Sequence, residues 1–217
     1  MMKNLATSIC LLLTFVSPAF AQVPYTSDFY PLVVGSKWTY RVIDLKAPQT
    51  KADPKRKVVI EVEREEPYIH KESKDGKDTE KKYMGFILKA TSGDKLTRDH
   101  VIVLEQGVHS IHVAGTPILP PKLFFKLGLK PGESWTTDSV GGNTILKGTS
   151  TVNQVVVDLP KLGKRDAFLI SYSNDKKGDQ RQEIDYWFVQ GIGMVKQRVM
   201  TKNHEIVLEL ENYEKAK

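Results

Sequence analysis

The feature that most constrains the fold is an alternation of apolar and polar side chains with a period of two. Trp38, Tyr40 and Val42 alternate with polar residues, and similar patterns recur over 58–62 and 206–210. Successive side chains of a β-strand point to opposite faces, so this pattern predicts strands with one buried face. The sequence shows no alternation of strand and helix patterns, and we predict an all-β protein.

Short turn sequences separate these runs. They include Ser92-Gly93-Asp94, Gly141-Gly142-Asn143 and Gln190-Gly191-Ile192-Gly193, which suit reversal of the chain. Short strands joined by tight turns predict an antiparallel meander. We expect about ten strands, near 37–45, 57–65, 82–91, 97–105, 107–114, 133–138, 144–158, 164–173, 182–190, 193–201 and 204–213.

An open sheet of this many strands would curl or split, and it would leave two exposed edges. We therefore predict a strongly bent meander sheet, either a barrel or an open half-barrel, around an apolar interior. One helical turn is expected from Lys122 to Leu127, after Pro120-Pro121. The charged stretch from Arg64 to Lys82 is expected to be an exposed, mobile hairpin tip.

The first residues have the pattern of a secretory signal peptide. Lys3 precedes an apolar run over 5–16 that contains Cys10, the only cysteine, and Ala19-Phe20-Ala21 offers small residues for cleavage after Ala21. The apolar run is too short for a membrane span, which needs roughly 20 residues. We expect residues 1–21 to be the signal peptide and residues 22–217 to form a single all-β domain, periplasmic or secreted, without disulfides or a transmembrane span.

The charge is modest and mixed, with a formal net charge of +6. The densest cationic stretch, Lys51 to Lys57, is open to two interpretations: a contact for anionic partners, or a solvated loop before a strand. No aromatic residue is interleaved there to stack on bases. We therefore favour the solvated loop and expect no nucleic-acid partner.

The chain contains three short aromatic segments. Gly35 precedes Trp38 by three residues and Gly132 precedes Trp135 by three, which predicts two similar turns into strands. The third segment, over 185–196, is an aromatic strand followed by Gly191-x-Gly193 and a second strand. It lacks the later glycine and the helix of a phosphate-binding loop.

The aromatic residues of these segments have two candidate roles. They either line a ligand cavity or form an ordinary core. The candidate cavity-lining residues are Trp38, Tyr40, Trp135, Tyr186 and Trp187.

In these segments the sequence resembles the TapB-like family, a diffuse group of bacterial exported proteins of unknown function. The first shared motif is Tyr-Pro-Leu-x-x-Gly-x-x-Trp-x-Tyr over 30–40, and the second is Tyr-Trp-x-x-x-Gly-x-Gly-x-Val-Lys over 186–196. Between them, Leu159-Pro160-Lys161-Leu162-Gly163 departs from the family pattern. The resemblance covers residues 22–217 and implies a bent antiparallel sheet, but no chemistry.

No residue pattern indicates an enzyme. The histidines are His70, His100, His109, His112 and His204. In a regular strand, His109 and His112 would lie on opposite faces and could not share a metal. No serine lies in a Gly-x-Ser-x-Gly motif. We predict no catalytic residues, no metal site and no cofactor.

Three functions remain as hypotheses. The favoured one is a carrier or binding module for a lipid or another apolar or amphipathic small molecule, held inside the curved sheet. The second is a structural or adaptor protein of the cell envelope that binds an envelope protein through its outer surface. The third, an exported hydrolase, would need a cleft assembled by folding.

Overall fold

A computed structural model describes residues 28–46, 56–74, 77–176 and 178–216. The predicted signal peptide, with its cleavage site at Ala21, lies outside the described residues, as do residues 51–55 of the cationic stretch. The strands are β1 (Lys37–Asp44), β2 (Lys57–Lys74), β3 (Lys77–Ser92), β4 (Lys95–Leu104), β5 (Gly107–Val113), β6 (Thr116–Lys126), β7 (Ser134–Gly141), β8 (Thr144–Leu159), β9 (Gly163–Asn174), β10 (Glu183–Val189), β11 (Gly193–Met200) and β12 (Glu205–Glu214), and a 3₁₀ turn, η2, spans Gly178–Gln180.

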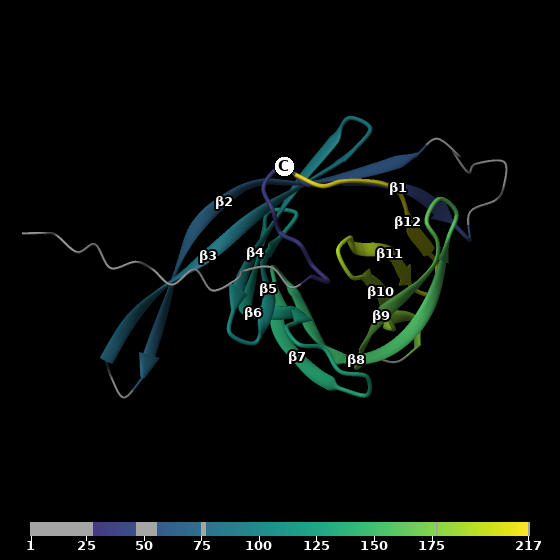
Figure 1. Ribbon diagram of the computed structural model, residues 1–217. Coiled ribbons are helices and arrows are strands. Elements are labelled where there is room, and N and C mark those ends of the chain that lie inside the picture. Colours follow the sequence, from purple (N-terminus) through teal and green to yellow (C-terminus); the bar gives the residue numbers. More distant parts are fainter. Residues whose placement is uncertain (1–27, 47–55, 75–76, 177, 217) are drawn as a thin grey trace, which may run out of the picture.

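The twelve described strands form one closed antiparallel barrel (Figure 1). Each strand pairs with its neighbours in sequence, and β1 pairs with both β2 and β12, which closes the sheet. The predicted all-β class and meander are confirmed, and the closed barrel is the form found. The described residues include no helix long and apolar enough to cross a membrane.

The prediction of a helical turn from Lys122 to Leu127 is wrong, because most of this segment belongs to β6. Lys122 pairs with Ser110 and Phe125 with Val108 of β5. If this segment formed a helical turn, β5 would lack these strand partners. The alternation that marks other strands is interrupted here by two register shifts. β-Bulges of this kind hide the period of two.

The seam between β6 and β7 is short. Only Ile118↔Gly141 and Leu119↔Val140 are paired there. Pro120 and Pro121 follow at once, and proline has no backbone N–H to continue a ladder. Further along, the indole of Trp135 bridges the seam by donating to the Leu123 carbonyl at 3.2 Å.

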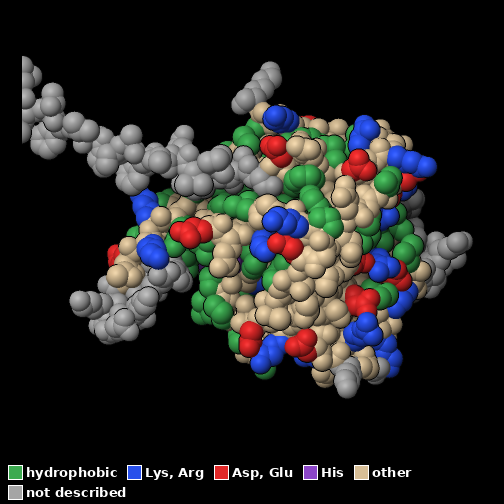
Figure 2. Space-filling model, turned by 60° about the horizontal axis from the view of Figure 1, so that its bottom comes forward, with side chains coloured by type: hydrophobic (Ala, Val, Ile, Leu, Met, Phe, Trp, Pro, Cys, Tyr) green, Lys and Arg blue, Asp and Glu red, His purple; other side chains and the backbone are tan. Residues whose placement is uncertain are grey.

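The charged stretch over 64–82, expected to be an exposed, mobile hairpin tip, does belong to a hairpin, but its two strands are paired over a greater length than predicted. The β2–β3 pairing continues as far as Lys74↔Lys77, and the hairpin projects well beyond the barrel wall (Figure 1). Elsewhere on the surface, basic and acidic side chains are interspersed on the face drawn in Figure 2.

The two predicted glycine turns are confirmed as structural equivalents. Gly35 and Gly132 have φ of 90° and 84°, and each turn is closed by a hydrogen bond from the residue after the glycine to the carbonyl two residues before it. Each glycine N–H donates to a buried valine of the next strand, Val62 in β2 or Val152 in β8. The positive φ explains why glycine occupies both positions.

The barrel is filled at one end. Leu32, Phe125, Leu159, Phe188 and Val189 are all buried there. The segment before β1 enters the ring of strands (Figure 1), and its Tyr30 ring contacts the rings of Phe125 and Phe188. We call this the closed end. The opposite end carries the β3–β4, β5–β6 and β7–β8 turns and is called the mouth.

Candidate functional site

A cavity of about 550 Å³ occupies the barrel between its closed end and its mouth. Its wall is mostly apolar and aromatic, and it reaches the surface beside Val113, Thr116 and Thr144, which are exposed. The lining residues come from β1 to β11, the segment before β1 and the residue before β10: Tyr30, Trp38, Tyr40, Ile60, Leu88, Ala90, Asp99, Val101, Ser110, Val113, Thr116, Ile118, Lys122, Phe124, Gly141, Thr144, Leu146, Tyr172, Gln182, Ile184, Tyr186, Met194 and Gln197.

The floor of the cavity is an aromatic cluster built around Tyr30. Its ring lies 5.7 Å from that of Phe124, 5.8 Å from that of Phe125 and 5.6 Å from that of Phe188. Edge-to-face and offset contacts at these distances are favourable for aromatic rings. Burial raises the pKa of the Tyr30 phenol, so it stays neutral. The segment before β1 therefore closes the barrel floor.

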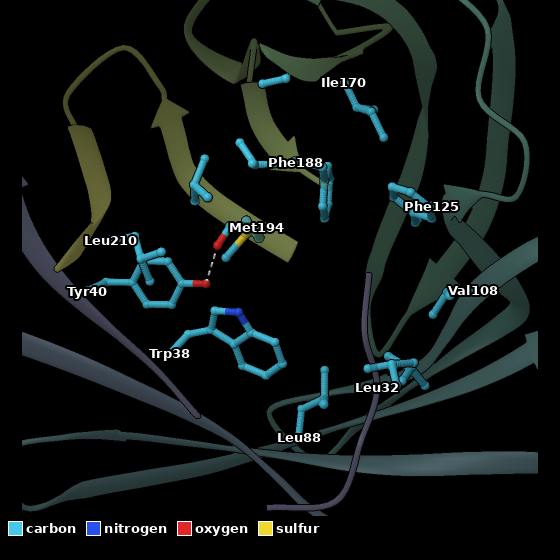
Figure 3. Close-up of a cluster of buried hydrophobic side chains, with 14 of the residues drawn as sticks. Leu32, Trp38, Tyr40, Leu88, Val108, Phe125, Ile170, Phe188, Met194 and Leu210 are labelled. Carbon is cyan, nitrogen blue, oxygen red and sulfur yellow. Dashed lines mark hydrogen bonds between the residues drawn. The ribbon is translucent and has the colours of Figure 1, made fainter. Parts of the chain in front are cut away.

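Trp38 and Tyr40 form one wall, and their polar atoms are used by the barrel itself. The Trp38 indole donates to the Ile192 carbonyl at 2.6 Å, and the Tyr40 hydroxyl donates to the Met194 carbonyl at 2.8 Å (Figure 3). With these atoms satisfied, the wall presents ring surface to the cavity. Such a surface suits an apolar ligand.

These contacts join the two motifs that carried the family resemblance. Trp38 and Tyr40, from the first motif, bind the carbonyls of residues 192 and 194 in the second. A Cβ on Gly193 would lie 3.2 Å from Pro31 and 3.3 Å from the Trp38 indole nitrogen. The glycine therefore permits the close approach of Pro31 and the Trp38 ring to the start of β11.

The five aromatic residues singled out in the sequence fall into two groups. Trp38, Tyr40 and Tyr186 line the cavity, whereas Trp135 and Trp187 do not. Trp135 bridges the β6–β7 seam, and the Lys196 ammonium lies 5.5 Å from the centre of the Trp187 ring. Tyr186 and Trp187 are adjacent in β10, so only one of them can face the interior.

Two charged side chains in the cavity wall were not predicted. Lys122 lies on β6, with its ammonium 4.2 Å from the centre of the Tyr172 ring, and burial lowers its pKa. Asp99 lies on β4 and accepts a 2.7 Å hydrogen bond from the Ala114 N–H; burial raises its pKa. The sequence offered one signal for Lys122, a cation within the mostly apolar segment 117–125, but the helical interpretation left its direction undefined.

The histidines do not assemble a metal site in the described part of the chain, where no group of three or more His, Cys, Asp or Glu side chains could hold a metal ion. The prediction that His109 and His112 face opposite ways is wrong. His109 pairs with Ile102 and His112 with His100, two residues apart on β4, because a bulge in β5 inserts Ile111. The His100 and His112 rings are 4.8 Å apart.

No protein-family model matches the sequence, and no curated protein does. Among solved structures, a "putative exported protein with YmcC-like fold" from Bacteroides fragilis is 13% identical, with a TM-score of 0.48, covering 86% of this chain and 99% of that one. A "putative lipoprotein" from Parabacteroides distasonis is 10% identical, with a TM-score of 0.47, covering 86% of this chain and 98% of that one. Neither description names a ligand.

Proposed function

We propose that this protein is an exported carrier that holds an apolar or amphipathic small molecule inside its barrel, in the periplasm or outside the cell. The observation that carries the proposal is the cavity of about 550 Å³. This volume lies within the roughly 300–1,000 Å³ of small-molecule sites. The signal-peptide pattern over 1–21 and the TapB-like motifs support the exported location.

The mouth supports transfer of such a ligand. Of the ten large apolar side chains that are exposed among the described residues, six lie on strand ends or turns around the mouth: Leu45, Leu96, Val113, Leu119, Val140 and Ile145. Leu119, Val140 and Ile145 form a continuous row across β6, β7 and β8. Exposed apolar surface beside an apolar cavity favours contact with the ligand's source.

Native mass spectrometry of protein purified from its own host tests the proposal. We expect an additional mass in the native spectrum that dissociates on unfolding and is identified as an apolar or amphipathic molecule. Spectra that repeatedly show only the bare polypeptide would count against the carrier function.

A pair of matched variants locates the bound molecule. Ala90→Trp places a large side chain in the cavity wall, whereas Val156→Trp adds the same side chain at a position of β8 that is 62% exposed. We expect the first to lose the co-purified molecule and the second to retain it, with unchanged circular dichroism in both. Retention by Ala90→Trp would place the molecule elsewhere.

A second candidate function is supported by the projecting β2–β3 hairpin (Figure 1). A long paired extension that leaves the barrel suits an adaptor for another envelope protein, and Ile69 on it is 56% exposed. Crosslinking in the host should then capture a partner that Ile69→Asp no longer captures. Equal capture by the variant would exclude this residue from the contact.

A further inference from the structure

Lys122 differs from other lysines near the barrel wall. Its ammonium lies 4.2 Å from the centre of the Tyr172 ring. Among the described residues, no carboxylate lies within 4.0 Å of it. By contrast, Lys126 is 3.1 Å from Glu133, Lys89 is 3.6 Å from Glu61, and Lys196 is 3.7 Å from Glu209. Lys122 thus places a cation in an apolar cavity without an anion beside it.

Such a placement is costly for the apo protein. A charge that leaves water loses solvation, and a cation–π contact restores only part of it. The lowered pKa of Lys122, caused by burial alone, reflects this cost. A ligand that brings an anion to the ammonium would remove the cost.

Asp99, the other charged side chain of the cavity wall, does not act as the counterion of Lys122. Asp99 accepts its hydrogen bond from Ala114, and the charges that act on its pKa do not include Lys122. Ser110, directly opposite Lys122 in the β5–β6 pair, also lines the cavity. Cβ atoms of such pairs lie about 4.5–5.5 Å apart, so the wall carries a hydroxyl donor on the strand next to Lys122.

We propose that the ligand is an anionic amphiphile, whose carboxylate or phosphate head group binds Lys122 while its aliphatic chain lies against the aromatic wall of the cavity. This inference rests on the proposed carrier function and adds the chemical class of the ligand. The remaining wall supports the aliphatic part, because Trp38, Tyr40 and Phe124 expose ring surface there.

Isothermal titration of delipidated protein with three probes of equal chain length tests the inference. The probes are palmitate, hexadecyl phosphate and 1-hexadecanol, which share the chain and differ in the head group. We expect at least one of the two anions to bind more tightly than the alcohol, and the tighter one indicates whether the source is a carboxylate or a phosphate.

Variants then assign the effect to Lys122. A hydrogen-bonded charge pair corresponds to about 10- to 100-fold in affinity, so Lys122→Met should weaken the preferred anion by about that factor and leave 1-hexadecanol unchanged. Lys122→Arg should retain the preference for the anion. Lys126→Met, which removes a lysine already paired with Glu133, should bind like the wild type.

The outcomes separate the two proposals. If 1-hexadecanol binds as tightly as both anions, or Lys122→Met binds the anion like the wild type, the anion site is overturned and the carrier function stands. If none of the three probes binds the wild-type protein, both are overturned. The comparison of probes on the wild type holds even if Lys122→Met does not fold.

Discussion

The hydroxyl of Tyr40 is a test of how the barrel interior is held together. Tyr40 is 1% exposed, and its hydroxyl donates to the Met194 carbonyl at 2.8 Å, across the interior from β1 to β11 (Figure 3). Tyr40→Phe removes one oxygen and leaves the ring in place. The Met194 carbonyl then loses this donor in a region that water reaches poorly.

The expected loss follows from the cost of an unsatisfied buried acceptor, about 1–3 kcal/mol. For a protein of this size, each kcal/mol lowers Tm by about 2–4 °C. We therefore expect Tyr40→Phe to lower the free energy of unfolding in urea by about 1–3 kcal/mol and Tm by about 2–12 °C. The slope of the urea transition should not change.

Tyr213 supplies the matched control. Its ring stacks on that of Trp38 at 5.3 Å, but its hydroxyl is buried and has no hydrogen-bond partner among the described residues. Tyr213→Phe removes an unsatisfied group and should leave stability unchanged or slightly raised. A loss for Tyr213→Phe as large as that for Tyr40→Phe would refute this assignment of the two hydroxyls.

Three further predictions concern single residues. Because burial raises the pKa of Asp99, its protonation on acidification adds to the free energy of unfolding. We therefore expect Asp99→Asn, which keeps the accepting oxygen, to be more stable than the wild type at pH 7, with the difference vanishing well below the ordinary value of 3.8 in urea titrations. Gly193→Ala should cost more stability than Gly191→Ala, because both glycines have positive φ but only a Cβ at 193 meets neighbouring atoms; equal losses in urea unfolding would contradict this. Trp135→Phe, which cannot donate to the Leu123 carbonyl, should speed hydrogen exchange at amides beside the β6–β7 seam and leave those of β9 unchanged.

The strands were predictable where the barrel keeps a regular inside and outside. β1 and β8 bury alternate residues, so the period of two survives in the sequence. β6 was missed because two register shifts and the pair Pro120-Pro121 interrupt its alternation. Barrel closure depends on the pairing of β1 with β12, a contact between distant segments that no local pattern encodes.

The site was predictable only in part, for a related reason. An aromatic strand indicates an apolar interior but not how completely side chains fill it, so Trp38 lines the cavity while Phe188 is packed in the closed end. Bulges also decide direction, as the shift in β5 that places His109 and His112 on one face shows. The inward direction of Lys122 likewise depends on the register of β6 rather than on its neighbours in sequence.

A crystal structure with 16-bromohexadecanoate bound tests the central claim most directly, because the anomalous signal of bromine locates the end of the aliphatic chain. We predict bromine inside the barrel, between the floor at Tyr30 and the mouth, with the carboxylate beside Lys122. Bromine found only on the outer surface, or an interior filled by the protein's own side chains, would contradict the account.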